Sequence, residues 1–490
     1  MIMEKLLTGR QLGLARQVRE AIHANPFTGK RHLANCALAG LAPSTAPDMA
    51  QERAIAKVEN LMRRMEHDGP VVLPHQDHAN RQPLADILLF SLFHRYLPAL
   101  DRHITKQAAT GTSLTLACGP DLYADLARLG FTRQERCHYI ALFFQMRRAF
   151  FFIRNSLIGA SPCMERLRAR LWDTVFTHDI GRYEQHLIDR LEDFSTLLLG
   201  ETGTGKGLAA AAIGRSGFIP YDAHRHCFAT SFSQAFLAIN LCQFPAELLE
   251  SELFGHVRGA FTGAVRDHQG IFARSSRHGS VFLDEIGEIS EQIQIKLLRI
   301  LQERTFTPVG SHVSDHFEGR LIGATNRDLD TLRAEERLRD DFYFRISTVM
   351  LTLPPLRRRI RENSGELAEL VRFLVGRIAG KQAQQTLAPP VIEELMSRGA
   401  LTHDWPGNVR ELEQAVRGII LTGTWQKTGH RAGPACLERL AGSPSPPTMA
   451  ELASSYCQAL LREHSTIQAV ARITGLDRRT VKKHLDRTSR

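Results

Sequence analysis

The sequence lacks the segments that direct a chain into a membrane or out of the cell. Charged residues are interspersed with apolar ones over residues 1–20, so the continuous apolar segment of a secretory signal is missing there. The most apolar stretch, residues 139–153, is too short to cross a bilayer and carries Arg147 and Arg148 at its centre. We therefore expect a cytoplasmic protein in which residues 139–153 form a buried helix.

Cysteine is also sparse, with 8 among 490 residues. The cysteines are widely spaced and show no CxxC pair or other zinc spacing: Cys36, Cys118, Cys137, Cys163, Cys227, Cys242, Cys436 and Cys457. We expect reduced thiols. His75 and His78 lie close together with Asp77 between them, but no matching His or Cys pair accompanies them. A solvated polar loop is therefore favoured over a metal site.

Composition places the chain among folded proteins. Hydrophobic residues make up 43% and charged residues 23%, which excludes the low-hydrophobicity, high-charge class of disordered chains. A length of 490 residues exceeds what one hydrophobic core supports, so about three domains are expected. The formal net charge of +10 favours a polyanionic partner, provided that the charge is concentrated in one place.

The spacing of apolar residues predicts an α/β core flanked by helical regions. From residue 196 onward, short apolar strands alternate with helices, which is typical of a parallel sheet covered on both faces. Strands are expected at 196–199, 236–239, 281–283 and 321–324. The expected segments are a mostly helical N-terminal domain at 1–155, the α/β subdomain at 156–352, a helical lid at 353–425, a linker at 426–448 containing Gly442 to Pro447, and a terminal helical module at 449–490. Residues 1–155 contain no recognisable chemistry and no receiver-like cluster of acidic residues, so control by aspartate phosphorylation is not supported.

A glycine-rich loop follows the first expected strand and precedes an alanine-rich helix. The residues are Gly200, Glu201, Thr202, Gly203, Thr204, Gly205, Lys206 and Gly207. Strand, loop and helix in this order are the context of a P-loop, in which backbone N–H groups and the helix N-terminus face phosphates and the lysine reaches the β- and γ-phosphates. A glycine-rich turn that binds nothing is the minor alternative. The loop therefore predicts ATP binding.

The chain departs from the general P-loop at Gly207, because a Ser or Thr normally holds Mg²⁺ at this position. Asp284 and Glu285 follow an apolar strand at the edge where open α/β sheets bind ligands. We expect Asp284 to organise Mg²⁺ and Glu285 to polarise the attacking water. The alternative is a solvated acidic pair, which the apolar strand before it disfavours.

Residues 250–264 resemble the bacterial enhancer-binding proteins, the AAA+ activators of sigma-54 promoters. The most specific residues are Gly259, Ala260, Phe261, Thr262, Gly263 and Ala264. The resemblance extends with interruptions over residues 159–421 and implies that this stretch is a loop tip that contacts the sigma factor. Two glycines around an exposed Phe and Thr are compatible with a mobile loop.

The resemblance implies roles for further residues. Asn240 resembles the switch asparagine that restrains Glu285, and Thr325 with Asn326 resembles the sensor of the γ-phosphate. The arginines that it assigns are Arg339 and Arg345, which reach the neighbouring subunit's site, and Arg410, which closes the lid on the phosphates. Because two arginines act in trans, it also implies a ring, usually a hexamer. Taken singly, each arginine is more often a surface ion-pair residue.

The chain departs from the family at several positions. These are Gly207, Val257, the longer connection at 214–233, and Arg357, Arg358 and Arg359 in place of Arg-Glu-Arg. None of them removes a group that does chemistry. We therefore expect hydrolysis to be retained.

The terminal module predicts a helix-turn-helix. Helices are expected at 451–461, 467–474 and 477–485, with Val470, Ile473, Leu476, Val481 and Leu485 buried together. This arrangement leaves Arg478, Arg479, Thr480, Lys482 and Lys483 on or near an outer face suited to a major groove. The module resembles the Fis-type DNA-binding ends of the same family, and a solvated basic face is the alternative.

Three functional hypotheses remain at this point. The favoured one is a DNA-bound activator that hydrolyses ATP and remodels sigma-54 RNA polymerase for promoter opening. The second is a DNA-binding repressor or scaffold that binds ATP with little hydrolysis, which only Gly207 and the altered loops support. The third is an AAA+ machine for another substrate, which has no need of the 259–264 sequence. The sequence identifies neither the signal sensed by residues 1–155 nor the target promoters.

Overall fold

The protein is described here by a computed structural model that covers residues 7–74, 79–426, 448–464 and 466–486. The chain divides into two compact units, Met1–Trp425 and Gln426–Arg490. The expected polar loop at His75 to His78, Cys436, and Gly442 to Pro447 of the expected linker lie outside the described residues. The seven described cysteines form no disulfide.

The first part of the larger unit is helical, as the sequence predicts. Its helices are α1 (Gly9–His23), α2 (Gly29–Ala39), α3 (Pro47–His67), α4 (Arg81–Thr110), α5 (Gly119–Arg128), α6 (Arg133–Ser156) and α7 (Pro162–Phe176), followed by α8 (Ile180–Arg182), the π-turn η1 (Tyr183–Leu187) and the 3₁₀ turn η2 (Leu191–Asp193). Thr132 and Glu135 form a capping box at the start of α6. The expected buried helix at 139–153 lies inside α6, and Arg148 is fully buried there.

No helix within the described residues is long and apolar enough to span a bilayer.

The central sheet is parallel and has the order β4-β5-β8-β1-β9. Its strands are β1 (Thr196–Leu199), β4 (Phe236–Asn240), β5 (Ser280–Asp284), β8 (Arg320–Thr325) and β9 (Val349–Thr352). The four strands predicted from the sequence are confirmed. The fifth, β9, lies at the edge and is partly exposed, so it lacks the continuous apolar character of a central strand.

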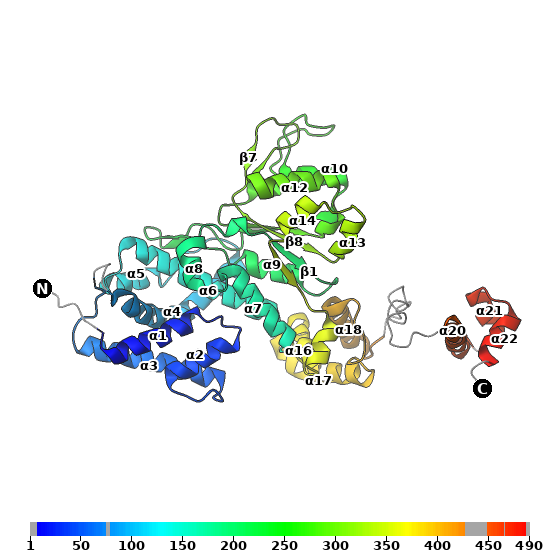
Figure 1. Ribbon diagram of the computed structural model, residues 1–490, viewed down its shortest axis with the longest axis horizontal. Coiled ribbons are helices and arrows are strands. Elements are labelled where there is room, and N and C mark those ends of the chain that lie inside the picture. Colours follow the sequence, from blue (N-terminus) through cyan, green and yellow to red (C-terminus); the bar gives the residue numbers. More distant parts are fainter. Residues whose placement is uncertain (1–6, 75–78, 427–447, 465, 487–490) are drawn as a thin grey trace. The chain divides into compact units, whose positions relative to one another are not determined.

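Helices lie on both faces of this sheet (Figure 1), and a hydrophobic core covers each face. Leu198 packs in the core of the N-terminal helices, and its neighbour Leu197 packs in the opposite core, as the alternation along a strand requires. The helices of the α/β subdomain are α9 (Lys206–Gly214), α10 (Ala246–Phe254), α11 (Ile271–Arg274), α12 (Glu291–Glu303), α13 (Leu329–Ala334) and α14 (Asp340–Ile346), with the 3₁₀ turns η3 (Leu241–Gln243) and η4 (Ile286–Glu288). Of these helices, α9 packs its alanines into the core of the N-terminal helices.

The long connection after α9 forms a hairpin of β2 (Tyr221–Asp222) and β3 (Cys227–Phe228). This hairpin docks on the N-terminal helices: the Leu116 N–H donates to the His226 carbonyl at 2.8 Å, and the ring of Phe228 stacks on Phe144 with centroids 3.8 Å apart. The additional residues at 214–233 therefore attach the helical region to the α/β subdomain.

The lid consists of α15 (Leu356–Glu362), α16 (Glu366–Ala379), α17 (Lys381–Ser397) and α18 (Asn408–Thr422). It has a core of its own, in which Trp405 stacks on Trp425 with ring centroids 5.2 Å apart. The all-helical lid beyond residue 353 is thus present as predicted.

The smaller unit contains α20 (Met449–His464), α21 (Ile467–Thr474) and α22 (Arg478–Asp486). Val470 and Val481 are fully buried in its core, against which Leu476 and Leu485 pack. The expectation that Ile473 joins this core is wrong, because its side chain is 46% exposed. On a helix of only 8 residues, the face that meets the two neighbouring helices is too narrow to include Ile473.

Candidate nucleotide-binding site

A cavity of about 480 Å³ lies where β1, β4 and β5 end, between the P-loop and the lid. Residues 202–208 line it together with Asn240, Asp284, Glu285 and Arg410. The structure therefore brings together side chains that the sequence places on four separate segments. The carboxyl ends of parallel strands share one edge of the sheet, which is the physical reason for the convergence.

The P-loop backbone is shaped by its glycines. Gly203 has φ = +80°, and a Cβ there would lie 2.2 Å from the Gly407 carbonyl oxygen of the lid. Within the described residues, the N–H groups of Gly203, Gly205 and Lys206 donate to no protein acceptor. These N–H groups and the N-terminus of α9 form a cradle for an anion of phosphate size.

Lys206 is the buried cation of the cradle. Its side chain is 7% exposed, and Nζ donates to the Gly200 carbonyl at 2.9 Å. Burial lowers the pKa of Lys206, whereas the negative charges of Glu285 and Asp284 counteract that shift. A phosphate oxygen would be a stronger acceptor for this ammonium group than the carbonyl that it contacts here.

The acidic pair lies opposite Lys206 at the end of β5. The Glu285 N–H donates to Asp284 Oδ1 at 3.1 Å, and Glu285 adopts a left-handed backbone conformation with φ = +59°. This conformation is uncommon for glutamate and turns its side chain away from the line of the strand. Two adjacent carboxylates near a phosphate cradle suit a metal ion and a water molecule.

The two asparagines that the family resemblance singled out, Asn240 and Asn326, lie at different positions around this pair. The Asn326 N–H contacts Glu285 Oε2 at 3.4 Å, and its side-chain amide donates to Thr202 Oγ1 at 3.0 Å. Asn240 Oδ1 accepts from the Cys242 N–H at 3.0 Å, and in the described residues its side chain makes no hydrogen bond to Glu285. Asn326 thus connects the acidic pair with the P-loop, and Asn240 lines the cavity from β4.

Asn408 and Arg357 join the lid to the P-loop, and sequence reasoning missed both roles. Asn408 is fully buried with φ = +53°, and its amide donates to Glu201 Oε2 at 3.1 Å and to the Thr202 carbonyl at 3.0 Å. Arg357 forms a two-pronged ion pair with Glu201. The hydrogen bond from the guanidinium of Arg357 lowers the pKa of Glu201. The run of three arginines, noted only as a departure, was the available signal.

A second ion pair anchors the start of the lid. Arg359 Nε donates to Glu366 Oε1 at 2.7 Å, and both side chains are almost completely buried. Glu366 Oε2 also accepts from the N–H groups of Ala160 and Ser161 at 2.7 and 2.9 Å. The segment before α7 is thereby fixed against the lid, because leaving either charge of a buried pair without its partner costs several kcal/mol.

The 259–264 loop lies away from the cavity, next to the hairpin of β6 (Thr305–Phe306) and β7 (Asp315–His316). Gly259 and Gly263 have φ of +85° and +104°, and a Cβ on either would meet no atom within 4 Å. The Phe261 ring is 38% exposed and contacts the His256 ring edge-on at a centroid distance of 4.9 Å. The predicted exposed tip is present, held at its base by the bridge between His256 and His268.

The comparisons with known proteins decide the identity of this region. Residues 182–352 match the family described as Sigma-54 interaction domain. The chain contains a sigma-54 interaction domain. This domain includes the P-loop, the acidic pair and the 259–264 loop, and the lid lies beyond its matched residues.

Two relatives of this chain are regulatory proteins by name. The chain is 36% identical over 274 residues to the Nif-specific regulatory protein of Azotobacter vinelandii, covering 55% of this chain and 45% of that protein. It is 40% identical over 233 residues to the hydrogenase transcriptional regulatory protein HoxA of Cupriavidus necator, covering 47% and 44%. A crystal structure of NtrX from Brucella abortus aligns with a TM-score of 0.41 and 20% identity, over 75% of this chain and 79% of that one. The chain thus matches less than half the length of the two curated relatives.

The sigma-54 interaction domain carries its two candidate trans arginines outside the cavity. Arg339 pairs with Glu291 at 2.7 Å and with Asp341 at 2.9 Å, which raises its pKa. Arg345 is exposed, and its Nε donates to the Leu301 carbonyl at 3.2 Å. Neither residue lines the nucleotide cavity of its own chain. Arg410, in contrast, lines it from α18 and has an exposed side chain.

The smaller unit presents a basic face on α22. Arg478, Arg479, Lys482 and Lys483 are exposed. Asp477 caps the helix: its Oδ1 accepts from the Arg479 and Thr480 N–H groups at 2.8 and 2.9 Å, and these bonds, with that from the Thr480 hydroxyl, lower the pKa of Asp477. The sequence prediction of an outer basic face is consistent with this geometry.

Proposed function

We propose that the chain is a sigma-54-dependent transcriptional activator. In this proposal it binds DNA upstream of promoters, assembles into a ring and uses ATP hydrolysis to remodel sigma-54 RNA polymerase for promoter opening. The observation that carries it is the Gly259 to Ala264 loop with its exposed Phe261, inside a sigma-54 interaction domain whose cavity also gathers Lys206, Asp284 and Glu285.

The residues of the cavity suit MgATP. The P-loop N–H groups and Lys206 would hold the phosphates, and Arg410 would close on them from the lid. Asp284 would hold Mg²⁺, whose remaining positions are left to phosphate oxygens and water because Gly207 has no hydroxyl. When bound, Mg²⁺ would neutralise part of the negative charge of the phosphates. Glu285 would orient the attacking water and accept its proton, with Asn326 holding its carboxylate.

A second subunit would complete the site. Arg339 and Arg345 lie outside the cavity of their own chain, so a single subunit lacks these two cations for the charge that develops on the γ-phosphate. A head-to-tail arrangement would supply it and would close into a ring, which we take to be a hexamer.

Mixing two inactive variants tests this arrangement. Lys206→Ala subunits keep their arginines, and Arg345→Ala subunits keep their P-loop. Equal mixtures should regain about a quarter of wild-type turnover, because about half of the subunits carry an intact P-loop and about half of their neighbours carry the arginine. A mixture as inactive as its components would refute the trans role of Arg345.

The terminal module would anchor the ring to DNA. Four exposed cations on α22 would neutralise backbone phosphates, and Thr480 on the same helix would face the base edges of a major groove. Such anchoring raises the local concentration of subunits and therefore favours assembly near the promoter.

A DNA-binding repressor or scaffold with little hydrolysis remains the second candidate. Gly207 favours it, because the missing hydroxyl removes one Mg²⁺ ligand. Asp284 and Glu285 favour the activator, since a module that only binds ATP needs no carboxylate at the water position.

Transcription in vitro separates these functions. The wild-type chain with sigma-54 RNA polymerase, ATP and a promoter should form open complexes only when ATP is hydrolysable. Thr262→Ala should hydrolyse ATP and form none, whereas Thr105→Ala, an exposed threonine on α4, should behave as the wild type. Absence of ATP-dependent open complexes with the wild type would refute the activator proposal.

A further inference from the structure

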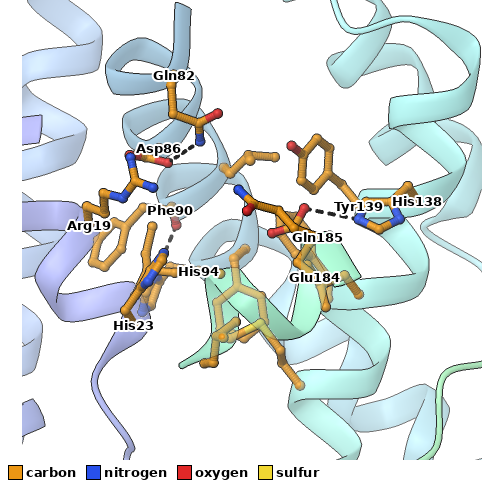
Figure 2. A pocket seen from close by; sticks show the side chains of 18 of the residues that line it. Arg19, His23, Gln82, Asp86, Phe90, His94, His138, Tyr139, Glu184 and Gln185 are labelled. Carbon is orange, nitrogen blue, oxygen red and sulfur yellow. Dashed lines mark hydrogen bonds and ion pairs between the residues drawn. The ribbon is translucent and has the colours of Figure 1, made fainter. Parts of the chain in front are cut away.

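A second cavity, of about 420 Å³, lies within the N-terminal helical region (Figure 2). Helices α1, α2, α4 and α6 form its walls, and α8 with η1 closes it. Figure 2 shows Gln82 and Asp86 on one side and His138, Tyr139 and Glu184 on the other. Its volume falls in the range of sites that enclose small organic ligands, and nothing in the activator proposal uses it.

The acidic groups of this cavity already have partners. Asp86 accepts from the Gln82 amide at 2.9 Å and lies 3.9 Å from Arg19, and burial raises its pKa. Glu184 lies 3.0 Å from His138 Nε2. The carboxylates therefore have little remaining demand for a positively charged ligand.

Several hydrogen-bond donors that line the cavity, in contrast, have no acceptor within the described residues. Within the described residues Arg31 uses only Nη1, which donates to the Ala21 carbonyl, and it has no acidic partner. Burial lowers the pKa of Arg31 to about 10, so it stays charged at neutral pH. The Tyr139 hydroxyl and the Gln185 amide line the same cavity, and neither has a hydrogen-bond partner in the described part of the chain. A desolvated cation with free N–H groups favours an anionic ligand group.

The rest of the lining is mostly apolar. Its apolar side chains are Ile22, Leu89, Phe90, Phe93, Leu142, Phe143, Met146 and Ile180, of which three are aromatic. His94 adds no charge, because burial lowers its pKa to about 4 and its Nδ1 donates to the Phe90 carbonyl at 2.9 Å. Such a lining suits a ring-sized apolar body.

We propose that this cavity binds a small monocarboxylate with an aromatic body, whose carboxylate is held by Arg31 and whose ring packs among the phenylalanines of α4 and α6. Tyr139 donates a further hydrogen bond to the ligand. The site is separate from the nucleotide cavity, and its occupancy does not depend on the activator proposal.

The same helix that lines this cavity also holds the P-loop helix. On the other face of α6, Gln145 donates to the Ser216 carbonyl at 3.0 Å, and Arg148 donates to the Arg215 and Gly217 carbonyls at 3.0 and 2.6 Å. Gln145 is also bonded to Tyr183, the neighbour of Glu184 on η1. Ligand binding that shifts α6 or η1 therefore acts on the end of α9, whose beginning carries Lys206.

Calorimetric titration of the full chain tests the site. The probes are benzoate, phenylacetate and 3-phenylpropionate, with 2-phenylethanol, 2-phenylethylamine and acetate as matched compounds that lack the charge, reverse it or lack the ring. At least one aromatic acid should bind with a Kd below about 1 mM, and each matched compound should bind at least about tenfold more weakly. Arg31→Gln should weaken binding at least about tenfold, whereas Lys30→Gln, its exposed neighbour outside the cavity, should not.

Tyr139→Phe provides a second variant, because it removes one hydroxyl without changing the packing. It should weaken binding several-fold while unfolding at the same urea concentration as the wild type. Bound acid should also change ATP turnover by about fivefold. Absence of binding by all three acids, equal binding of 2-phenylethanol and phenylacetate, or wild-type affinity in both variants would overturn the site. Unchanged turnover with the acid bound would overturn the link through α6.

Discussion

The side-chain amide of Asn408 donates a hydrogen bond to the Glu201 carboxylate, with 3.1 Å between Nδ2 and Oε2. Asn408, the first residue of α18, thereby bonds directly to the P-loop. Asn408 Oδ1 also accepts from the Leu356 N–H at 2.7 Å, so one buried side chain connects the P-loop with both ends of the lid. The lid and the phosphate cradle are therefore expected to move together.

Asn408→Ala should destabilise the chain by about 2–5 kcal/mol. The change leaves the buried Leu356 N–H without an acceptor and places alanine in a left-handed conformation, at about 1–3 and 1–2 kcal/mol respectively. Urea unfolding followed by tryptophan fluorescence measures the loss, since Trp405 lies near the site. Asn60→Ala, an exposed position on α3, should change the free energy of unfolding by less than about 0.5 kcal/mol. Equal stability of the two variants would contradict the role of Asn408.

Gly207→Ser should be tolerated and should lower the Mg²⁺ concentration needed for ATP turnover. A Cβ there would lie 3.9 Å from its nearest neighbour, Phe282 Cε1, and serine is favoured over glycine in a helix by about 0.5 kcal/mol. The hydroxyl would face the cavity as an additional Mg²⁺ ligand. Gly203→Ser is the contrasting variant and should impair nucleotide binding, because its Cβ would overlap the Gly407 carbonyl. A Mg²⁺ dependence unchanged by Gly207→Ser would speak against the position of the metal.

Glu285→Gln should bind ATP and hydrolyse it at least about 100-fold more slowly. The amide keeps the shape of the side chain but accepts no proton from water. Binding should be as tight as in the wild type or tighter, since a negative charge next to the phosphates is removed. Fluorescent-nucleotide titration and phosphate release measure the two effects. Glu288→Gln, on the neighbouring turn, serves as control, and equal turnover of Glu285→Gln and wild type would remove Glu285 from the catalytic role.

Stability should fall as the pH is lowered from 6.5 to 4, in part through His103. This side chain is 7% exposed and lies beside the stacked rings of Phe144 and Phe228, with centroid distances of 5.5 and 5.9 Å. Burial, and then the positive charges of Arg148 and Lys106, lower its pKa from 6.5 to about 4. The unfolded chain therefore binds a proton in this interval that the folded chain does not, so acid favours unfolding by about 2–3 kcal/mol at pH 4.

His103→Met should reduce this dependence. Chemical denaturation at pH 7 and at pH 4 measures the change in unfolding free energy between the two conditions. His67→Met removes an exposed histidine and should leave that difference unaltered. A His103→Met variant with the full wild-type loss of stability would show that His103 titrates normally in the folded chain.

Arg479→Ala should weaken binding of the full chain to duplex DNA and reduce the salt dependence. Loss of one phosphate contact lowers the slope of log K against log salt by about 0.9 for each contacting module. Lys57→Ala removes the same charge from the exposed face of α3 and should have no such effect. Fluorescence anisotropy at several salt concentrations distinguishes the two variants, and identical slopes would exclude α22 from the DNA interface.

Local sequence patterns predicted the parts of the nucleotide site that follow one another along the chain. Gly200 to Lys206 directly follows a strand and precedes a helix, so its conformation depends on neighbours in sequence. Asp284 and Glu285 come at the end of an apolar strand, so their position also depends on neighbours in sequence. Asn408 and Arg357 were missed because their common partner, Glu201, lies 207 and 156 residues away in the sequence. No local pattern indicates a contact between residues so far apart.

The sequence by itself determined the α/β class of the core, the P-loop, the acidic pair and the exposed Gly259 to Ala264 loop, because each depends on short-range spacing and on backbone freedom at glycine. Only the tertiary structure decided that the 214–233 connection docks on the N-terminal helices and that Arg31, Tyr139 and Glu184 line one cavity. These residues lie on separate helices, and each helix has an amphipathic surface. Which faces meet is set by packing over the whole core, and that information is not present in any one segment.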